Sequence, residues 1–120
     1  MNPDNLSPLN LAYLGDAVHE LLIRTSVIAQ GNRPVNKLNK AGVKQARASA
    51  QSRFYHILEE VLTEDELAVM KRGRNAKSFS RAKNATMSDY RRATGVEALF
   101  GYLYLQGKTD RIKELYDLSQ

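Results

Sequence analysis

The spacing of apolar residues along the first third of the chain predicts helices. Ser7-Pro8 places an N-cap residue before a proline at the first helical position, which is a signal for a helix start. Apolar residues then recur at steps of three and four, as on one face of a helix, up to Gln30-Gly31. These residues are Leu11, Leu14, Val18, Leu21 and Leu22. Arg33-Pro34 interrupts the pattern, and a shorter helical stretch rich in Lys, Ala and Gln follows over about residues 36–50.

A second apolar stripe, over residues 54–62, predicts a further helix. Thr63 and Glu66 have the spacing of a capping box, so the next helix is expected to begin there. The helical pattern stops around Gly73. Residues 74–86 are polar and basic without periodicity, which predicts a loop, and loops of this length are usually functional or disordered.

The last third of the chain predicts two more helices. Ser88 is expected to cap a long helix that ends near Gln106-Gly107, and Thr109 is expected to cap a short terminal helix. No segment alternates with a period of two for long enough to indicate a strand. The predicted fold class is therefore all-α.

The composition indicates one domain of an ordinary kind. The 120 residues, 13.5 kDa, suit a single domain over 1–120 with a core of its own. The absence of cysteine excludes disulfides, thiolate zinc sites, iron–sulfur clusters and a cysteine nucleophile. No apolar run approaches the roughly 18–20 residues of a membrane helix, and the N-terminus lacks the features of a signal peptide. We therefore expect a cytoplasmic protein without a membrane partner.

The charge is concentrated in the middle of the chain. The net charge is +5, but residues 71–92 alone hold eight basic side chains and a single acidic one. Such a local excess favours a polyanionic partner, of which nucleic acid is the commonest. The alternative is a basic loop that is merely solvated.

Two carboxylates stand in apolar helical surroundings. Asp16 follows Gly15 within the first predicted helix, and Glu97 lies between Val96 and Ala98 in the most apolar stretch of the chain. Gly15 and Gly101 each cost a helix about 1 kcal/mol relative to Ala, which is tolerated where a backbone or a ligand must come close. A hard divalent cation between the two helices would satisfy two such carboxylates. The alternative is that both lie exposed on the polar sides of amphipathic helices.

Glu20 lies one turn after Asp16 and could join the same site, but the same spacing makes it a surface partner for Arg24, which we favour. His19 and His56 lack the spacing of metal ligands, and we interpret both as structural or surface residues.

Two segments of the chain resemble the catalytic helices of ribonuclease III. Residues 11–18, LAYLGDAV, contain Asp16, and residues 97–105, EALFGYLYL, begin with Glu97. The interval of 81 residues between the two carboxylates also fits the endonuclease domain of that family. Residues 72–77 stand where the family has a glycine-containing turn. The resemblance covers nearly the whole chain and implies a ribonuclease III endonuclease-domain-like helical bundle.

The sequence departs from the general family pattern at three positions. Leu9 and Ala12 stand where the signature segment usually has glutamates, and Thr94 stands where the second motif usually has an aspartate. No double-stranded-RNA-binding domain follows the predicted helices. The Mini-ribonuclease III subfamily, a stand-alone endonuclease domain, shares these departures, and the sequence is similar to it throughout. With only two carboxylates, waters and RNA phosphate oxygens would have to complete the coordination of a metal.

The resemblance implies Mg²⁺-dependent hydrolysis of double-stranded RNA, in the maturation of 23S ribosomal RNA precursor ends. Asp16 is then the essential Mg²⁺ ligand, which also orients the attacking water, and Glu97 is the second ligand. The resemblance also implies a two-fold homodimer and leaves open whether a ribosomal protein presents the substrate. The alternative is a non-catalytic double-stranded-RNA-binding module with the same fold. The missing glutamates at positions 9 and 12 favour that module, whereas the retained Asp16 and Glu97 oppose it.

A domain without an appended RNA-binding domain must hold the substrate itself, by contacts with phosphates and 2′-hydroxyls across the minor groove. Candidate phosphate contacts in and beside the predicted loop are Arg72, Arg74, Lys77, Arg81 and Lys83. A second basic row would share one side of the helix predicted over 36–50. This row consists of Lys37, Lys40, Lys44 and Arg47, and its alternative is an ordinary solvated helix face.

Overall fold

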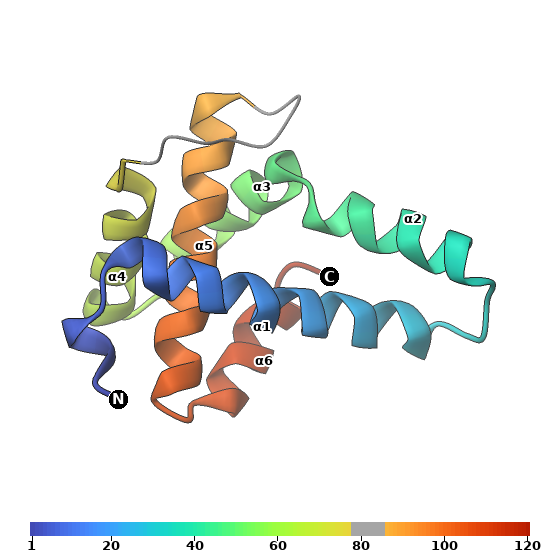
Figure 1. Cartoon of the computed structure of the whole chain (residues 1–120), viewed down its shortest axis with the longest axis horizontal. Coiled ribbons are helices and arrows are strands. Elements are labelled where there is room, and N and C mark those ends of the chain that lie inside the picture. The colour runs from blue at the N-terminus through green and yellow to red at the C-terminus, as the bar shows by residue number, and fades with distance from the viewer. Residues whose placement is uncertain (78–85) are drawn as a thin grey trace.

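The computed structural model describes residues 1–77 and 86–120, and these residues are helical apart from short connections (Figure 1). The elements are the 3₁₀ helix η1 (Pro3–Asn5), then α1 (Pro8–Ala29), α2 (Val35–Ala46), α3 (Ala48–Glu59), α4 (Glu64–Asn75), α5 (Met87–Leu105) and α6 (Thr109–Asp117). Within the described ranges, the predicted all-α class is confirmed.

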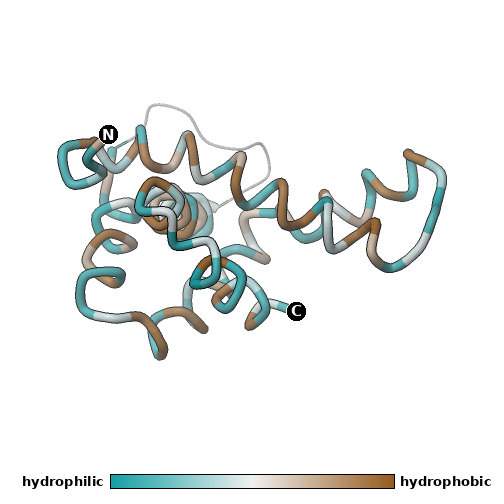
Figure 2. The backbone as a smooth tube through the Cα atoms, turned by 90° about the horizontal axis from the view of Figure 1, so that it is seen from below, coloured by the Kyte–Doolittle hydropathy of each residue, from teal (hydrophilic) through white to brown (hydrophobic). Residues whose placement is uncertain are grey.

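Helix α5 forms the centre of the fold, and α1, α3, α4 and α6 pack around it (Figures 1 and 2). From Ala93 to Leu103 every residue of α5 is buried except Glu97, which is half-buried. A helix that is apolar on all sides belongs inside a bundle. The second half of α1 and the whole of α2 extend away from this bundle as an arm (Figure 1). None of the described helices is long and apolar enough to cross a membrane.

Two helix starts that the sequence predicts are confirmed. The Ser7 hydroxyl accepts a hydrogen bond from the Asn10 N–H at 3.2 Å and caps α1. Thr63 and Glu66 form a full capping box on α4, in which each side chain accepts the backbone N–H of the other residue.

Three local predictions are wrong by a few residues. The stretch expected over 36–50 is two helices, because Arg47 is extended and turns the chain so that α3 packs against α5. Thr86 and not Ser88 caps α5, since its hydroxyl accepts the Asp89 N–H at 3.0 Å. Thr109 is the first residue of α6, and no side chain caps that helix.

The prediction that helical structure stops around Gly73 is also wrong. Helix α4 continues to Asn75, so Arg74 belongs to its last turn and not to a loop. A Cβ on Gly73 would lie 2.7 Å from the Cβ of Ala98 and 2.9 Å from the Cα of Gly95. This glycine therefore allows α4 to approach α5 closely. Of the loop predicted after it, residues 78–85 lie outside the described part of the chain.

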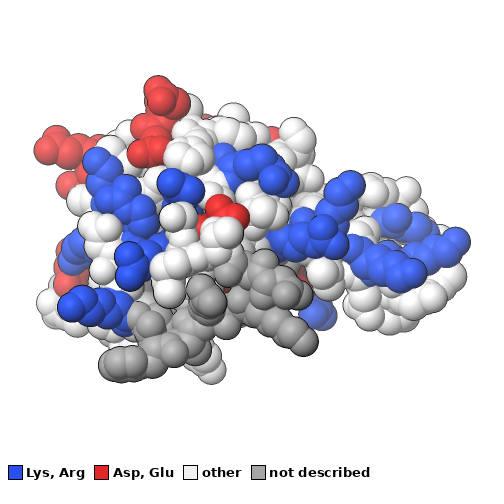
Figure 3. All heavy atoms as spheres, turned by 90° about the horizontal axis from the view of Figure 1, so that it is seen from above, with Lys and Arg blue, Asp and Glu red and all other residues white. Residues whose placement is uncertain are grey.

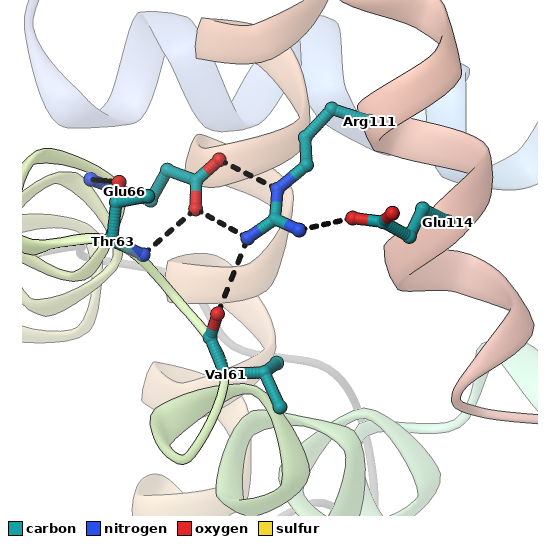
Figure 4. A network of polar contacts seen from close by, with 5 residues as sticks. All are labelled: Val61, Thr63, Glu66, Arg111 and Glu114. Atoms are coloured by element: carbon teal, nitrogen blue, oxygen red, sulfur yellow. Dashed lines mark hydrogen bonds and ion pairs between the residues drawn. The ribbon is translucent and has the colours of Figure 1, made fainter.

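Arg111 connects α6 to the turn before α4 (Figure 4). Its guanidinium donates two hydrogen bonds to the Glu66 carboxylate, at 2.8 and 2.9 Å, and one to the Val61 carbonyl at 3.2 Å. It also pairs with Glu114 one turn along α6. The hydrogen bonds from Arg111 hold the pKa of the Glu66 carboxyl below its usual range.

Candidate active site

Asp16 and Glu97 lie next to each other where α1 crosses α5. Asp16 is exposed on α1, whereas Glu97 is half-buried in the core helix. Their carboxyl groups are hydrogen-bonded to each other. Because carboxylates only accept hydrogen bonds, two carboxyls in contact repel each other unless one of them binds a proton or a cation lies between them.

Gly15 and Gly101 explain why the two helices come so close. A Cβ on Gly15 would lie 1.6 Å from the carbonyl oxygen of Glu97, and a Cβ on Gly101 would lie 2.0 Å from that of Leu11. Any side chain at either position would force the helices apart. Of the two reasons expected for these glycines, the approach of a backbone is the one that the structure shows. The space beside Gly101 is filled by α1.

Glu97 has a strongly perturbed carboxyl group. Burial is the main cause, and the hydrogen bond with Asp16 and the negative charge of Asp16 act in the same direction, so that its pKa rises to about 9. Among the described residues, no basic side chain is hydrogen-bonded or ion-paired to either carboxyl. At neutral pH Glu97 therefore keeps its proton unless a cation from outside the chain replaces it.

The structure favours a surface role for Glu20, as the spacing indicated. Its Oε1 pairs with the Nε of Arg24 at 2.9 Å, and both side chains are solvent-exposed. The described residues contain no group of three or more His, Cys, Asp or Glu side chains arranged to hold a metal ion. Asp16 and Glu97 are thus left as a pair of ligand candidates.

One histidine is a buried structural residue and the other lies on the surface, as expected. His19 is buried against the rings of Phe54, Phe100 and Tyr116, with centroids 5.3 to 6.2 Å apart. Burial lowers its pKa to about 4, so the imidazole is neutral at pH 7. His56 is exposed and contacts Glu59 at 3.0 Å.

The predicted RNA contacts fall in two regions of the described chain. Lys37, Lys40 and Lys44 are exposed on α2, at spacings that share one side of a helix. Arg72 and Lys77 are exposed at the C-terminal end of α4. Figure 3 shows basic side chains spread over the face that includes these two regions. Two further candidates, Arg81 and Lys83, lie outside the described residues.

Sequence reasoning missed the surroundings of Arg74. This side chain is half-buried, and its Nη1 donates a hydrogen bond to the Tyr55 hydroxyl at 3.0 Å. On α5, the Nη1 of Arg92 donates to the Ser52 hydroxyl at 3.2 Å. The Arg91-Arg92 pair was visible as charge, but only the packing of α3, α4 and α5 shows that Arg92 and Arg74 lie on the same side of the fold.

Comparison with known proteins gives one family at the level of sequence and a close match to a solved structure. The family model described as Ribonuclease III domain matches residues 9–108. The chain is 48% identical over 115 residues to Mini-ribonuclease 3 of Thermoanaerobacter sp. (strain X514), covering 96% of this chain and 81% of that protein. It is 50% identical over 114 residues to Mini-ribonuclease 3 of Brevibacillus brevis, covering 95% and 85%. The crystal structure of a Fusobacterium nucleatum protein superposes with a TM-score of 0.86 at 35% identity, covering 95% of this chain and 91% of that one.

The chain belongs to the Mini-ribonuclease 3 family. It is an endoribonuclease of the ribonuclease III type, with the six-helix fold of that domain. The three departures from the wider ribonuclease III pattern are packing or surface positions here. Ala12 is buried, Leu9 is exposed, and the Thr94 hydroxyl donates to the Tyr90 carbonyl at 3.0 Å. None of these three positions supplies a further carboxylate to the site in this chain.

Proposed function

We propose that this chain cleaves double-stranded RNA by metal-dependent phosphodiester hydrolysis, with Asp16 and Glu97 as the ligands of Mg²⁺. The hydrogen-bonded carboxyl pair at the α1–α5 crossing carries this proposal. Two carboxyls in contact, one of them half-buried, are unfavourable as a purely structural arrangement because neither has a basic partner among the described residues.

The donor set fits Mg²⁺. This ion commonly takes one or two carboxylates from a protein and fills its other positions with waters and substrate phosphates. When bound, it would lower the pKa of a coordinated water and stabilise the negative charge on the departing oxygen. Asp16 is exposed, so it can contact both the attacking water and the substrate, whereas Glu97 holds its position from within the core helix.

We propose that the RNA phosphates contact the basic residues of both regions described above. Exposure of Lys37, Lys40 and Lys44 on α2 supports this proposal, as do Arg72 and Lys77 at the end of α4. Arg74, and Arg81 and Lys83 outside the described residues, complete the proposed set. Double-stranded RNA is recognised mainly through its backbone, so a basic face without base-specific contacts suffices.

A two-fold homodimer is the proposed assembly. The chain leaves large apolar side chains exposed on α1 and α2: Tyr13, Leu21, Ile28, Val35 and Val43. The two helices also line an apolar groove of about 330 Å³. Exposed apolar patches of this kind mark association surfaces, and a two-fold pair would present two sites to the two strands.

The dimer proposal is testable by sedimentation. Wild type is expected at twice the chain mass of 13.5 kDa, and Ile28→Glu with Val43→Glu at the mass of one chain. Ile57→Glu, at an exposed apolar position on α3, is the matched control and should stay dimeric. A monomeric wild type that still cuts both strands would contradict the proposal.

We propose 23S ribosomal RNA precursor ends, in the cytoplasm, as the natural substrate. Resemblance to the Mini-ribonuclease III subfamily supports this finer assignment. A precursor stem should then be cut faster than an unrelated duplex of equal length, and addition of ribosomal proteins to the stem tests whether one of them presents it.

The deciding experiment is incubation with a long duplex RNA, in Mg²⁺ or in EDTA. Cleavage in Mg²⁺ and binding without cleavage in EDTA are expected. Binding without cleavage in both conditions would instead support the non-catalytic RNA-binding module.

A further inference from the structure

Helix α3, the end of α4 and the start of α5 line a polar cavity of about 300 Å³. Its basic and hydroxyl-bearing lining comprises Tyr55 and His56 of α3, Arg74 of α4, and Ser88, Arg91 and Arg92 of α5. Among the described lining residues there are three arginines, and Glu59 is the one acidic residue. Guanidiniums that converge on a cavity repel one another unless an anion binds between them.

Two of the three arginines are held in place by hydrogen bonds to hydroxyl groups of α3. Arg74 lies 5.8 Å from the centre of the Tyr55 ring and donates its Nη1 to the Tyr55 hydroxyl. Arg92 donates its Nη1 to the Ser52 hydroxyl. Each guanidinium has five N–H donors, so most of them are left for a ligand. Holding the side chains before the ligand arrives lowers the entropy that binding costs.

Close helix packing brings the arginines of two helices to one place. A Cβ on Gly95 of α5 would lie 2.6 Å from the Met70 carbonyl and 3.2 Å from the Tyr55 ring. A Cβ on Gly73 of α4 would in turn lie 2.7 Å from the Cβ of Ala98 and 2.9 Å from the Cα of Gly95. The glycines therefore set the distance between Arg74 and the start of α5.

The two acidic groups at the cavity, Glu59 and Asp89, each pair with one residue of its lining and leave three arginines against two carboxylates. Glu59 contacts His56 at 3.0 Å. Asp89 lies in the first turn of α5, with its Oδ1 4.0 Å from the Nη1 of Arg92, and its N–H is capped by Thr86. Arg91 is exposed, and no carboxylate of the described residues pairs with it. The cavity therefore keeps an excess of positive charge.

We propose that this cavity binds one phosphate group of the RNA substrate. Guanidinium groups bind phosphate oxygens in a bidentate manner, and three of them around one cavity suit the tetrahedral phosphate better than a planar carboxylate. The proposal rests on RNA as the substrate of the proposed function. It does not depend on the metal site, because phosphate binding here needs neither Asp16 nor Glu97.

The test is duplex RNA binding in EDTA over a range of salt concentrations. The triple variant Arg74→Gln/Arg91→Gln/Arg92→Gln is expected to bind about tenfold more weakly near 0.1 M salt. Its slope of log K against log salt should fall by about one unit, because the three arginines share one phosphate. A fall of about three units would mean three separate surface contacts and would overturn the cavity proposal.

The matched control removes the same charge elsewhere. Arg53→Gln/Lys108→Gln/Lys113→Gln changes three exposed side chains of α3, the α5–α6 turn and α6 that do not line the cavity. This control should keep the wild-type salt slope. If both triple variants bind RNA equally, the cavity is not a phosphate site. Thermal unfolding of both variants checks that they fold.

Tyr55→Phe tests the positioning of Arg74. The ring stays in the core and the hydroxyl is lost, so RNA affinity should fall two- to fivefold. In the Arg74→Gln background the same change should have no effect on affinity, whereas a merely structural role would lower affinity in both backgrounds.

Three RNA substrates distinguish the sources of the phosphate. A duplex closed by loops at both ends offers only internal phosphodiesters, and open duplexes carry either 5′-hydroxyl or 5′-phosphate ends. Equal losses by the cavity variant on all three assign an internal phosphodiester. A loss confined to the 5′-phosphorylated duplex assigns a terminal phosphate. Wild type that binds RNA in EDTA but never cuts it would refute the proposed function and leave this inference standing.

Discussion

Two buried or half-buried carboxylates in this chain have opposite surroundings. Glu66 accepts hydrogen bonds from the Arg111 guanidinium and from the Thr63 N–H, and its pKa lies below the usual range (Figure 4). Glu97 has no basic partner among the described residues and is hydrogen-bonded to the Asp16 carboxyl, so its pKa rises to about 9.

The difference shows that Glu66 stabilises the fold, whereas Glu97 is available to bind a ligand. The chain supplies the cation for Glu66 and uses the pair to attach α6 to the turn before α4. At Glu97 the described chain supplies no such cation, and burial beside Asp16 raises the pKa of its carboxyl. Burying a charge is tolerated when it is paired, and buried carboxylates that lack a partner bind protons or metals instead.

The largest expected effect is the loss of RNA cleavage when either carboxyl at the α1–α5 crossing is replaced. Asp16→Asn and Glu97→Gln should each lower the rate of duplex RNA cleavage in Mg²⁺ by on the order of a thousandfold, because a neutral amide does not hold the cation. RNA binding in EDTA and thermal unfolding should stay near wild type. Glu60→Gln, at the exposed residue that follows α3, is the control. Single-turnover rates near wild type for either variant would refute the assignment.

Removal of the Arg111 cation should convert Glu66 into an unpaired buried carboxylate. Arg111→Met is expected to lower the free energy of unfolding by about 2–3 kcal/mol, somewhat under the cost of breaking a fully buried pair because Arg111 is partly exposed. Cleavage per folded molecule should be unchanged. Lys113→Met removes an exposed ion pair with Asp117 on the same helix and should cost less than about 1 kcal/mol. Urea unfolding measures the stability of both variants. Equal losses of unfolding free energy would contradict the proposed difference between the buried and the exposed ion pair.

His19 adds a third buried titratable group, and its effect depends on pH. The pKa of His19 is about 4 in the folded state, below the ordinary value of 6.5. Between these two pH values the unfolded chain therefore binds a proton at His19 and the folded chain does not. The stability that neutral His19 contributes is therefore complete above pH 6.5 and is lost as the pH falls toward 4, by roughly 2 kcal/mol at pH 5.

The raised pKa of Glu97 works in the opposite direction, because the folded state then keeps a proton that the unfolded state releases above pH 4.5. The measurement is therefore the difference between wild type and His19→Gln, from unfolding curves at pH 7.5 and pH 5. The variant should lose less stability on acidification. Parallel curves would show that His19 takes up its proton in the folded state.

The smallest effect is expected at Glu20. Glu20→Gln should change cleavage no more than a few-fold, because this side chain is paired with Arg24 and not with the carboxyl pair. The free energy of unfolding should change by less than about 1 kcal/mol, as for exposed pairs in general. A rate loss as large as that of Asp16→Asn would place Glu20 among the metal ligands.

Local signals in the sequence predicted those parts of the fold that depend on neighbouring residues. Ser7 and the Thr63–Glu66 capping box each mark a helix start through bonds within one turn, so the pattern was sufficient. The end of α4 was predicted around Gly73, two residues early, because the apolar periodicity stops there while the helix continues through polar residues to Asn75. The break at Arg47 has no glycine or proline beside it and had no local signal.

For the site, the sequence by itself determined which carboxylates are exceptional: Asp16 and Glu97 oppose the local preference of apolar helices, and that conflict is visible without a structure. Only the tertiary structure decided how they are related. The 1.6 Å clash that a Cβ on Gly15 would make with Glu97, the contact between the two carboxyls, and the absence of a basic partner in the described chain all depend on residues about 80 positions apart. Helical periodicity reports which face a residue occupies, but the charge state of a buried group depends on what the opposite helix places against it.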